Sequence, residues 1–235
     1  MRLDQYLSKA MGISRSQSRK LIASGQVTVD GQLCKAADFQ LGENPQVTAQ
    51  GKALGVKEFV YIMLHKPQGI VSASRDKRDK TVVDLVAKDF PRRELFPAGR
   101  LDKTSTGFVL LTDDGALAHR LLAPKRHVTK EYLVELDTPL TPEMIRGFEE
   151  GVTLADGQTM QPAQVSNPDP SRPCLVRVLL RQGVYHQIKR MFGVYGAGVN
   201  ALHRTAIGGV ALDPALEPGQ WRELTREELE KLQRD

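Results

Sequence analysis

The sequence predicts an α+β fold in two parts: a small N-terminal domain of helices and short strands, and a larger domain with a mostly antiparallel mixed sheet. The length of 235 residues suits a small domain joined to a medium one. Apolar residues recur at helical spacing near the N-terminus, whereas later apolar runs are short, β-rich and interrupted by few helices. Runs of strands with few helices between them are typical of α+β domains rather than of βαβ series.

Two helices and a strand pair are expected in the N-terminal domain. The apolar side chains of residues 3–10 share one helical face, and Gly12 ends that helix. Ser14 is the expected N-cap of a second helix, which ends at Gly25. Residues 27–31 read VTVDG, in which a short alternating strand runs into an Asp-Gly pair that favours a tight turn.

These helices are basic. The first 25 residues carry five cations against one acid, a net charge of 5 − 1 = +4. The cations are Arg2, Lys9, Arg15, Arg19 and Lys20, and the acid is Asp4. Two basic helices flanked by hairpin strands are a recurring means of holding folded RNA through its shape and phosphates.

The larger domain is expected to begin near residue 58, because residues 43–57 are poorly periodic and interrupted by Gly, Pro and Gln. This divides the chain into 1–57, with its linker, and 58–235. A strand over 59–64 is expected to break in a loop at 65–69 before Ile70 and Val71 continue it. Further strands are expected over 108–111, 131–136 and 174–180, and helices over 117–122, 142–151 and 186–195.

Several classes of protein are excluded by composition and motifs. No apolar run reaches the roughly 18–20 residues that span a bilayer, and Asp4 and Gln5 stand where a signal peptide needs apolar residues. A cytoplasmic protein without a membrane partner is therefore expected. Cys34 and Cys174 are too isolated for a disulfide framework or a thiolate zinc site. No nucleotide-cofactor, serine-hydrolase or zinc-hydrolase motif is present, so nucleotide cofactors and serine or zinc hydrolysis lose their support.

Charge is distributed unevenly along the chain, whose net charge is +5. No Asp or Glu occurs from residue 171 to residue 212, and acids are missing again over 115–130. The first of these stretches carries Arg172, Arg177, Arg181, Lys189, Arg190 and Arg204. Such segregation suits a surface facing phosphates, because each neutralised phosphate releases counterions. A solvated basic face is the alternative interpretation.

Three local constellations could carry chemistry. The first, GRLDKTSTG over 99–107, places Asp102 in a loop whose bracketing glycines permit close approach of another backbone. The second is Lys130-Glu131-Tyr132 at the start of a strand, and the third is GVYHQIKRM over 183–191. Taken singly, these residues have ordinary interpretations as a turn former, a core tyrosine and a surface basic pair. Their occurrence together in this order favours a common site.

Together these residues resemble the pseudouridine synthases, and specifically the RsuA-type branch that modifies ribosomal RNA and carries an N-terminal S4 RNA-binding domain. Residues 1–31 resemble the S4 domain, HKPQG the first loop of the family, and residues 98–121 its aspartate motif. APKRHVTKEYLV, GVYHQIKRMF and LHRTAIGGV are similar to small-subunit enzymes of that branch. The resemblance implies an isomerase with an S4 domain followed by a mixed-sheet catalytic domain. Its reaction involves no redox or group transfer, so no cofactor and no metal are expected.

The resemblance implies three catalytic residues. Asp102 matches the catalytic aspartate, which acts at C1′ or C6 as nucleophile or as stabiliser of oxocarbenium-like charge; the sequence leaves both routes open. A carboxylate in a desolvated pocket needs a neighbouring cation to stay ionised, and Lys189 matches the family's basic position. Tyr132 matches the family's tyrosine, which stacks on uracil and assists removal of the C5 proton.

Further residues are expected to contact the RNA. A base inside folded RNA must be flipped out before a carboxylate can reach it. Arg100 matches the position that fills the vacated space, or else it pairs with a phosphate. Ile188 is expected to form an apolar floor beside the base, or to be ordinary core. The remaining predicted RNA contacts are His186, Gln187, Arg190, Arg2, Arg15, Arg19 and Lys20.

The sequence YHQIKRM in the third motif resembles small-subunit enzymes and so favours 16S rRNA as the substrate. By family resemblance the target is uridine 516. The enzyme is expected to be a monomer that acts on a partly assembled small subunit. A synthase acting on 23S rRNA and a non-catalytic S4 assembly factor are the alternatives. Two departures from the family pattern occur. Gln182-Gly183-Val184 replaces the family's Glu-Gly-Arg or Glu-Gly-Lys, which puts a phosphate contact at position 184 in doubt, and His65 replaces an Asn.

Overall fold

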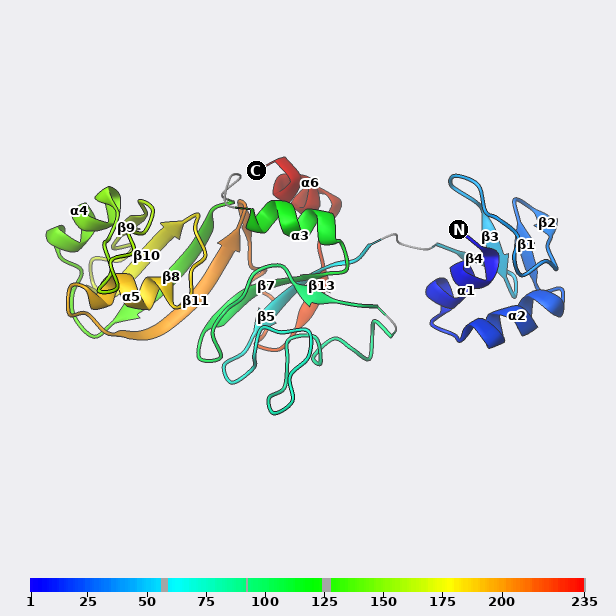
Figure 1. Ribbon diagram of the computed structural model, residues 1–235, viewed down its shortest axis with the longest axis horizontal. Coiled ribbons are helices and arrows are strands. Elements are labelled where there is room, and N and C mark those ends of the chain that lie inside the picture. The colour runs from blue at the N-terminus through cyan, green and yellow to red at the C-terminus, as the bar shows by residue number, and fades with distance from the viewer. Residues whose placement is uncertain (56–58, 92, 124–127, 235) are drawn as a thin grey trace. The chain divides into compact units, whose positions relative to one another are not determined.

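The structure, a computed structural model, describes residues 1–55, 59–91, 93–123 and 128–234 (Figure 1). Its contacts divide the chain into two compact units, each described here by itself. The N-terminal unit comprises Met1–Phe59 with Ala87–Glu94, and the larger unit comprises Val60–Val86 with Leu95–Asp235. A single boundary near residue 58 does not anticipate that residues 87–94 group with the N-terminal unit.

The two expected N-terminal helices are present as α1 (Leu3–Met11) and α2 (Arg15–Ala23). Gly12 ends α1 in the left-handed conformation, with φ of 64°, which glycine adopts without a steric penalty. Ser14 caps α2 and forms a capping box with Gln17, so two backbone N–H groups of the first turn are satisfied. The sequence prediction of this helix pair is confirmed.

A four-stranded antiparallel sheet completes the N-terminal unit, in the order β2-β1-β3-β4. Its strands are β1 (Val27–Val29), β2 (Gln32–Leu33), β3 (Val47–Ala49) and β4 (Lys52–Leu54). The expected turn at Asp30-Gly31 joins β1 to β2, both residues having positive φ. The β3–β4 hairpin was not predicted, because each of its strands is only three residues long and offers too few positions to show alternation.

The larger unit is built on one sheet, which in the described residues has the order β13-β5-β7-β11-β8-β10-β9, with β12 beside β11 and β6 beside β7. The strands are β5 (Tyr61–Lys66), β6 (Phe96–Pro97), β7 (Thr106–Thr112), β8 (Lys130–Leu136), β9 (Gln164–Ser166), β10 (Leu175–Leu180), β11 (Val199–Ile207), β12 (Val210–Ala211) and β13 (Trp221–Glu223). All pairs are antiparallel except β7 with β11, which confirms the mostly antiparallel mixed sheet.

Two expectations around β5 are wrong. His65 and Lys66 were expected in a loop but belong to β5, because they pair with Phe108 and Gly107 of β7. Ile70 and Val71 do not continue the strand; Val71 forms only an isolated bridge to Thr81. The proline and the glycine of this segment signal a break correctly, but pairing with β7 carries the strand two residues further than local signals indicate.

Four helices accompany the sheet of the larger unit in the described residues: α3 (Gly115–Leu122), α4 (Pro142–Glu150), α5 (Gln187–Gly193) and α6 (Arg226–Arg234). Asp114 caps α3 and Thr141 caps α4, each through its side chain. Leu117 and Leu121 of α3 and Leu232 of α6 share one apolar cluster with side chains of β5 and β7, and α3 and α6 lie side by side in Figure 1. The helix α6 was not predicted.

The parallel contact between β7 and β11 joins two halves of this sheet. It consists of the partners Thr106 with His203 and Gly107 with Arg204. Gly107 has φ of 106°, and a Cβ built there would lie 2.3 Å from the carbonyl oxygen of Arg204. The prediction that a glycine after Asp102 permits close approach of another backbone is confirmed here. One half of the sheet carries the Asp102 loop, and the other carries β8, β10 and α5.

Candidate active site

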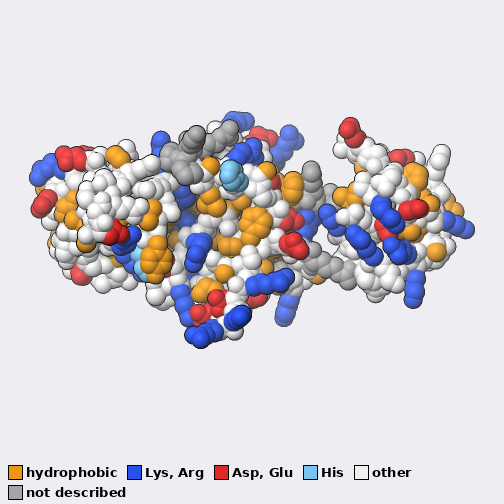
Figure 2. Space-filling view, in the orientation of Figure 1, with side chains coloured by type: hydrophobic (Ala, Val, Ile, Leu, Met, Phe, Trp, Pro, Cys, Tyr) orange, Lys and Arg blue, Asp and Glu red, His pale blue; other side chains and the backbone are white. Residues whose placement is uncertain are grey.

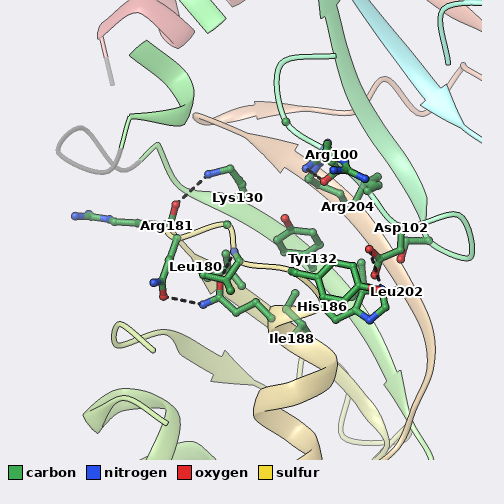
Figure 3. A pocket seen from close by; sticks show the side chains of 18 of the residues that line it. Arg100, Asp102, Lys130, Tyr132, Leu180, Arg181, His186, Ile188, Leu202 and Arg204 are labelled. Carbon is green, nitrogen blue, oxygen red and sulfur yellow. Dashed lines mark hydrogen bonds and ion pairs between the residues drawn. The ribbon is translucent and has the colours of Figure 1, made fainter. Parts of the chain in front are cut away.

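A pocket of about 690 Å³ lies in the larger unit, between the loop 99–105, strands β8 and β11 and the segment 180–189 (Figure 3). Seven predicted site residues line it: Arg100, Asp102, Tyr132, His186, Gln187, Ile188 and Lys189. They come from three motifs that are far apart in sequence. The fold therefore brings these three motifs to a single cavity.

The loop that carries Asp102 is held by polar contacts along its backbone. The hydroxyl of Ser72 donates to the carbonyl of Leu101 at 2.9 Å, and the N–H of Ser105 donates to the carbonyl of Asp102 at 3.0 Å. The buried ammonium of Lys66 donates to the carbonyls of Lys103 at 3.4 Å and Ser105 at 2.7 Å. Because these contacts lie on both sides of Asp102, its carboxylate projects from a fixed backbone.

Two basic side chains from the third motif flank the carboxylate of Asp102. His186 Nε2 lies 3.4 Å from Oδ1, and Lys189 Nζ lies 3.9 Å from Oδ2. Lys189 also donates to the hydroxyl of Thr104 at 3.1 Å, which keeps its ammonium beside the loop. The Asp102 side chain remains 30% exposed, so its oxygens are accessible from the pocket.

The turn before α5 directs His186 toward this carboxylate. His186 has φ of 51°, a left-handed conformation that is uncommon for residues other than glycine. The ring of Tyr185 stacks on its imidazole with a centroid distance of 3.8 Å. A strained backbone conformation next to a pocket is a marker of functional sites.

Apolar side chains and one aromatic ring form the floor of the pocket. Tyr132 on β8 is 7% exposed and Ile188 on α5 is 5% exposed. Leu180 of β10 and Leu202 of β11 lie beside them. In Figure 3 the ring of Tyr132 lies between Asp102 and the buried Lys130. This floor suits a flat, uncharged ring placed beside the Asp102 carboxylate.

Three buried cations around this site were not predicted: Lys66, Lys130 and Arg204. Lys66 and Arg204 are 0% and 1% exposed, and Lys130 is 7% exposed. Burial lowers the pKa of Lys66 to about 8, with Asp102 opposing and Arg204 reinforcing the shift. Burial, and then repulsion by Arg204, lowers the pKa of Lys130 to about 8.

Backbone carbonyls solvate the other two buried cations. Lys130 donates to the carbonyls of Val128 at 3.1 Å and Arg181 at 3.0 Å. Arg204 donates from Nε to the carbonyl of Phe108 at 2.7 Å and from Nη1 to the carbonyl of Arg100 at 3.4 Å. Among buried side-chain nitrogen and oxygen atoms of the described chain, only Nη2 of Arg204 has no hydrogen-bond partner.

The alternation of buried and more exposed residues along β8 could have identified Lys130 as a buried residue. Alternate residues of β8 are buried, and Lys130 shares that face with Tyr132, Val134 and Leu136. Arg204 gives a weaker signal, because its burial depends on its position opposite Tyr132 across β8 and β11. Lys66 was missed because residues 65–69 were expected to form a loop, where a lysine is normally exposed.

The remaining predicted contacts lie outside this pocket. Arg190 forms an ion pair with Asp156 and is not among the residues lining the cavity. Arg15 and Lys20 are exposed on α2, and basic side chains gather over α1 and α2 (Figure 2). Residues 124–127 of the second acid-free stretch lie outside the described residues.

Two cations of the N-terminal unit are engaged with one buried acid. Arg2 and Arg19 lie 3.2 and 3.1 Å from the carboxylate of Asp4, which is 2% exposed. Burial alone raises the pKa of Asp4, but hydrogen bonds from Arg19 and Arg2 outweigh it and hold that pKa below its usual value. The arginine side chains themselves stay 58% and 44% exposed, so their outer faces can still meet a phosphate.

Within the described ranges, no group of three or more His, Cys, Asp and Glu side chains is placed to hold a metal ion. No helix in the described part of the chain combines the length and apolar character needed to cross a membrane.

The arrangement can perform chemistry at a glycosidic carbon. A carboxylate with accessible oxygens and adjacent cations can attack such a carbon or stabilise positive charge that develops there. The apolar floor can position a base, and the phenol of Tyr132 faces the same cavity.

Comparisons with known proteins show the family of the chain. Residues 60–193 match the family model for RNA pseudouridylate synthase, and residues 1–47 match the S4 domain. An uncharacterized RNA pseudouridine synthase of Aquifex aeolicus is 42% identical, covering 100% of this chain and 97% of the relative. Ribosomal small subunit pseudouridine synthase A of Escherichia coli K12 is 38% identical, covering 97% of this chain and 98% of the relative. A solved structure described as a pseudouridylate synthase superposes with a TM-score of 0.70 at 37% identity, covering 99% of both chains.

Proposed function

Because the chain belongs to the RNA pseudouridylate synthase family of isomerases and carries an S4 domain, we propose that it converts one uridine of 16S ribosomal RNA, uridine 516, to pseudouridine. The observation that carries this proposal is the accessible Asp102 carboxylate, set between His186 and Lys189 in a pocket that Tyr132 also lines. The small-subunit substrate is supported by the name and full-length similarity of the Escherichia coli relative.

Asp102 is the proposed catalytic residue. In the reaction the bond between N1 and C1′ breaks, the uracil turns, a bond between C5 and C1′ forms, and the C5 proton leaves while N1 gains a proton. Asp102 acts either as the nucleophile at C1′ or C6, or by stabilising the oxocarbenium-like charge at C1′. Lys189, whose Nζ lies 3.9 Å from Oδ2, supplies positive charge beside the carboxylate.

Tyr132 and Ile188 are proposed to hold the base. The ring of Tyr132 stacks on uracil, and its phenol assists removal of the C5 proton, while Ile188 packs against the edge of the base. Both side chains are almost fully buried in the pocket floor, so their positions are fixed before the substrate arrives. Such a rigid site lowers the cost of ordering a flipped nucleotide.

Arg100 is proposed to act while the nucleotide leaves the RNA stack. Its side chain is exposed and stands two residues before Asp102, at the edge of the pocket. It fills the space left by the flipped base or pairs with a neighbouring phosphate. His186, Gln187 and Arg190 are proposed to contact the RNA around this opening.

The N-terminal unit is proposed to dock the RNA through Arg2, Arg15, Arg19 and Lys20, all of them exposed. The proposed functional boundary lies near residue 58, with residues 1–57 for docking and residues 58–235 for catalysis. The partner is ribosomal RNA in a partly assembled small subunit, met by a monomeric enzyme in the cytoplasm.

Mapping of pseudouridine in both ribosomal RNAs tests this proposal. Primer extension after chemical modification is compared between wild type and a strain from which the gene is deleted. We expect a single 16S site to disappear and to return when the gene is restored on a plasmid. Loss of a 23S site instead would assign the enzyme to the large subunit. No lost site in either RNA would favour a non-catalytic assembly role and overturn the proposal.

A further inference from the structure

Tyr185 is the most exposed large hydrophobic side chain among the described residues that line the pocket, with 73% of its surface accessible. A tyrosine ring left in water forgoes the stabilisation that burial of its apolar face would give. An exposed aromatic side chain at the rim of a pocket is therefore a candidate contact for a ligand.

The ring of Tyr185 is nevertheless held in one orientation. It stacks on the imidazole of His186 with a centroid distance of 3.8 Å and an interplanar angle of 18°. His186 is in turn fixed by its left-handed backbone conformation and by its position 3.4 Å from Asp102. One face of the tyrosine ring is thus covered by His186, and the other face is the one that can remain in solvent.

The surroundings of this ring suit an RNA strand. Tyr185 lies within the acid-free stretch of residues 171–212, so no carboxylate of that stretch opposes a phosphate. Lys189 and Arg181 line the same pocket on the same segment of the chain. Aromatic rings combined with nearby cations are the usual means of binding unpaired nucleotides, because every base has a face that can stack.

We propose that Tyr185 is a stacking platform for the base next to the flipped uridine. This inference rests on the proposed function, since flipping one nucleotide separates it from its neighbours and leaves a neighbouring base without a stacking partner. The tyrosine ring receives that base on its free face and so holds the strand while the uracil occupies the pocket floor. The contribution is to RNA affinity and to the choice of sequence beside the target, and the chemical step is left to Asp102.

The test compares Tyr185→Ala with Val194→Ala, a control at an exposed residue that does not line the pocket. Each is assayed on a 16S rRNA fragment containing uridine 516. We expect Tyr185→Ala to raise KM about 5- to 150-fold, the effect of losing one base–aromatic stack, with kcat nearly unchanged. Tyr185→Phe should restore KM, because a phenyl ring stacks as well as a phenol.

A fluorescent base in the RNA adds a second measurement, because its fluorescence changes only if Tyr185 stacks on it directly. With 2-aminopurine placed on either side of the target uridine, wild-type protein should quench one of the two probes. Tyr185→Ala should remove that quenching, and Val194→Ala should keep it.

Two results would overturn the inference while leaving the proposed function intact. The first is that wild-type protein forms pseudouridine while Tyr185→Ala has the same KM and the same quenching as wild type. The second is a fall in kcat with unchanged KM, which would mean that Tyr185 acts by holding His186 beside Asp102. Failure of wild-type protein to form pseudouridine at this uridine, both in the fragment and in a partly assembled small subunit, would instead overturn the proposed substrate, and with it this inference.

Discussion

In the N-terminal unit the carboxylate of Asp4 is 2% exposed and two largely exposed arginines reach it, whereas in the larger unit the carboxylate of Asp102 is 30% exposed. Around Asp102 the described buried charges are instead three cations, Lys66, Lys130 and Arg204, while the buried Asp114 of the same unit caps α3. The N-terminal unit therefore buries an acid between partly exposed arginines, whereas the Asp102 site combines buried cations with an accessible acid.

This contrast separates a structural carboxylate from one available for chemistry. The oxygens of Asp4 accept hydrogen bonds from Arg2 and Arg19, and burial leaves no room for a further partner. The closest basic groups to Asp102 lie at 3.4 and 3.9 Å, so its oxygens are accompanied by positive charge but are not all occupied. A carboxylate that must meet a substrate requires the second arrangement.

Replacing Asp102 tests the contrast most severely. Asp102→Asn should lower the rate of pseudouridine formation by about 10⁴-fold or more, as loss of a central catalytic group does, because the amide is neither a nucleophile nor a charge. RNA affinity, measured by filter binding, should stay near the wild-type value. The control is Asp79→Asn, at the partly exposed partner of Lys103, which should keep the wild-type rate. Turnover of Asp102→Asn near wild type would remove Asp102 from the mechanism.

Because of its buried lysines, the larger unit should become more stable as pH rises through the alkaline range. Their folded pKa of about 8 lies below the ordinary value of 10.5, so folding opposes their charged form and stability rises as pH increases from 8 to 10.5. Each lysine contributes at most about 3 kcal/mol to this rise. Trp221, the single tryptophan, reports unfolding of this unit in urea. Lys130→Met should remove about half of the rise.

Lys231→Met, at an exposed lysine of α6, is the matched control and should keep the whole rise. An undiminished rise in Lys130→Met would show that its ammonium is solvated in the folded protein. That result would break the contrast between the two units, because Lys130 would then resemble the exposed cations around Asp4.

Replacing the buried acid should destabilise the N-terminal unit. Asp4→Asn removes charged hydrogen bonds and should cost about 1–3 kcal/mol at pH 7, measured by hydrogen exchange of amides in residues 1–54. Because the folded pKa of Asp4 is lowered, its stabilisation is present above about pH 4 and is lost as pH falls through the folded pKa. The difference between Asp4→Asn and wild type should therefore shrink at low pH. Asp38→Asn, at an exposed acid of the same unit, should show no such change.

The exposed cations of α2 should give the smallest effect. The pair Arg15→Gln and Lys20→Gln should reduce the slope of log affinity against log salt by about one per residue, since each lost phosphate contact retains one counterion. Replacing Arg226 and Lys231 of α6 by Gln is the control, because it removes the same charges from the acid-rich C-terminal tail. An equal change in both double variants would assign the effect to net charge rather than to docking through α2.

Local signals account for what the sequence predicted well. The caps at Ser14 and Gly12 act within a few residues, so the helix pair could be placed correctly. Asp102 and Lys189 belong to contiguous motifs, and both line the pocket. Their roles in catalysis stay predictions until the variants are measured.

Long-range pairing accounts for what the sequence did not reveal. Arg204 Nε donates a hydrogen bond to the carbonyl of Phe108, which lies 96 positions earlier in the chain. A lone charged residue in a strand is ordinarily solvent-facing, and only the register between β8 and β11 shows that Arg204 faces Tyr132. The β3–β4 hairpin was missed for a related reason, since its pairing, rather than its composition, defines it.

The two-residue parallel ladder between β7 and β11 has a mechanical consequence. Asp102 leads into β7 on one side of this junction, while Tyr132 on β8 and Lys189 on α5 belong to the other side. A small change of angle at the junction alters the spacing between the carboxylate and both of its counterparts at once. This short ladder therefore sets the width of the pocket between the three side chains.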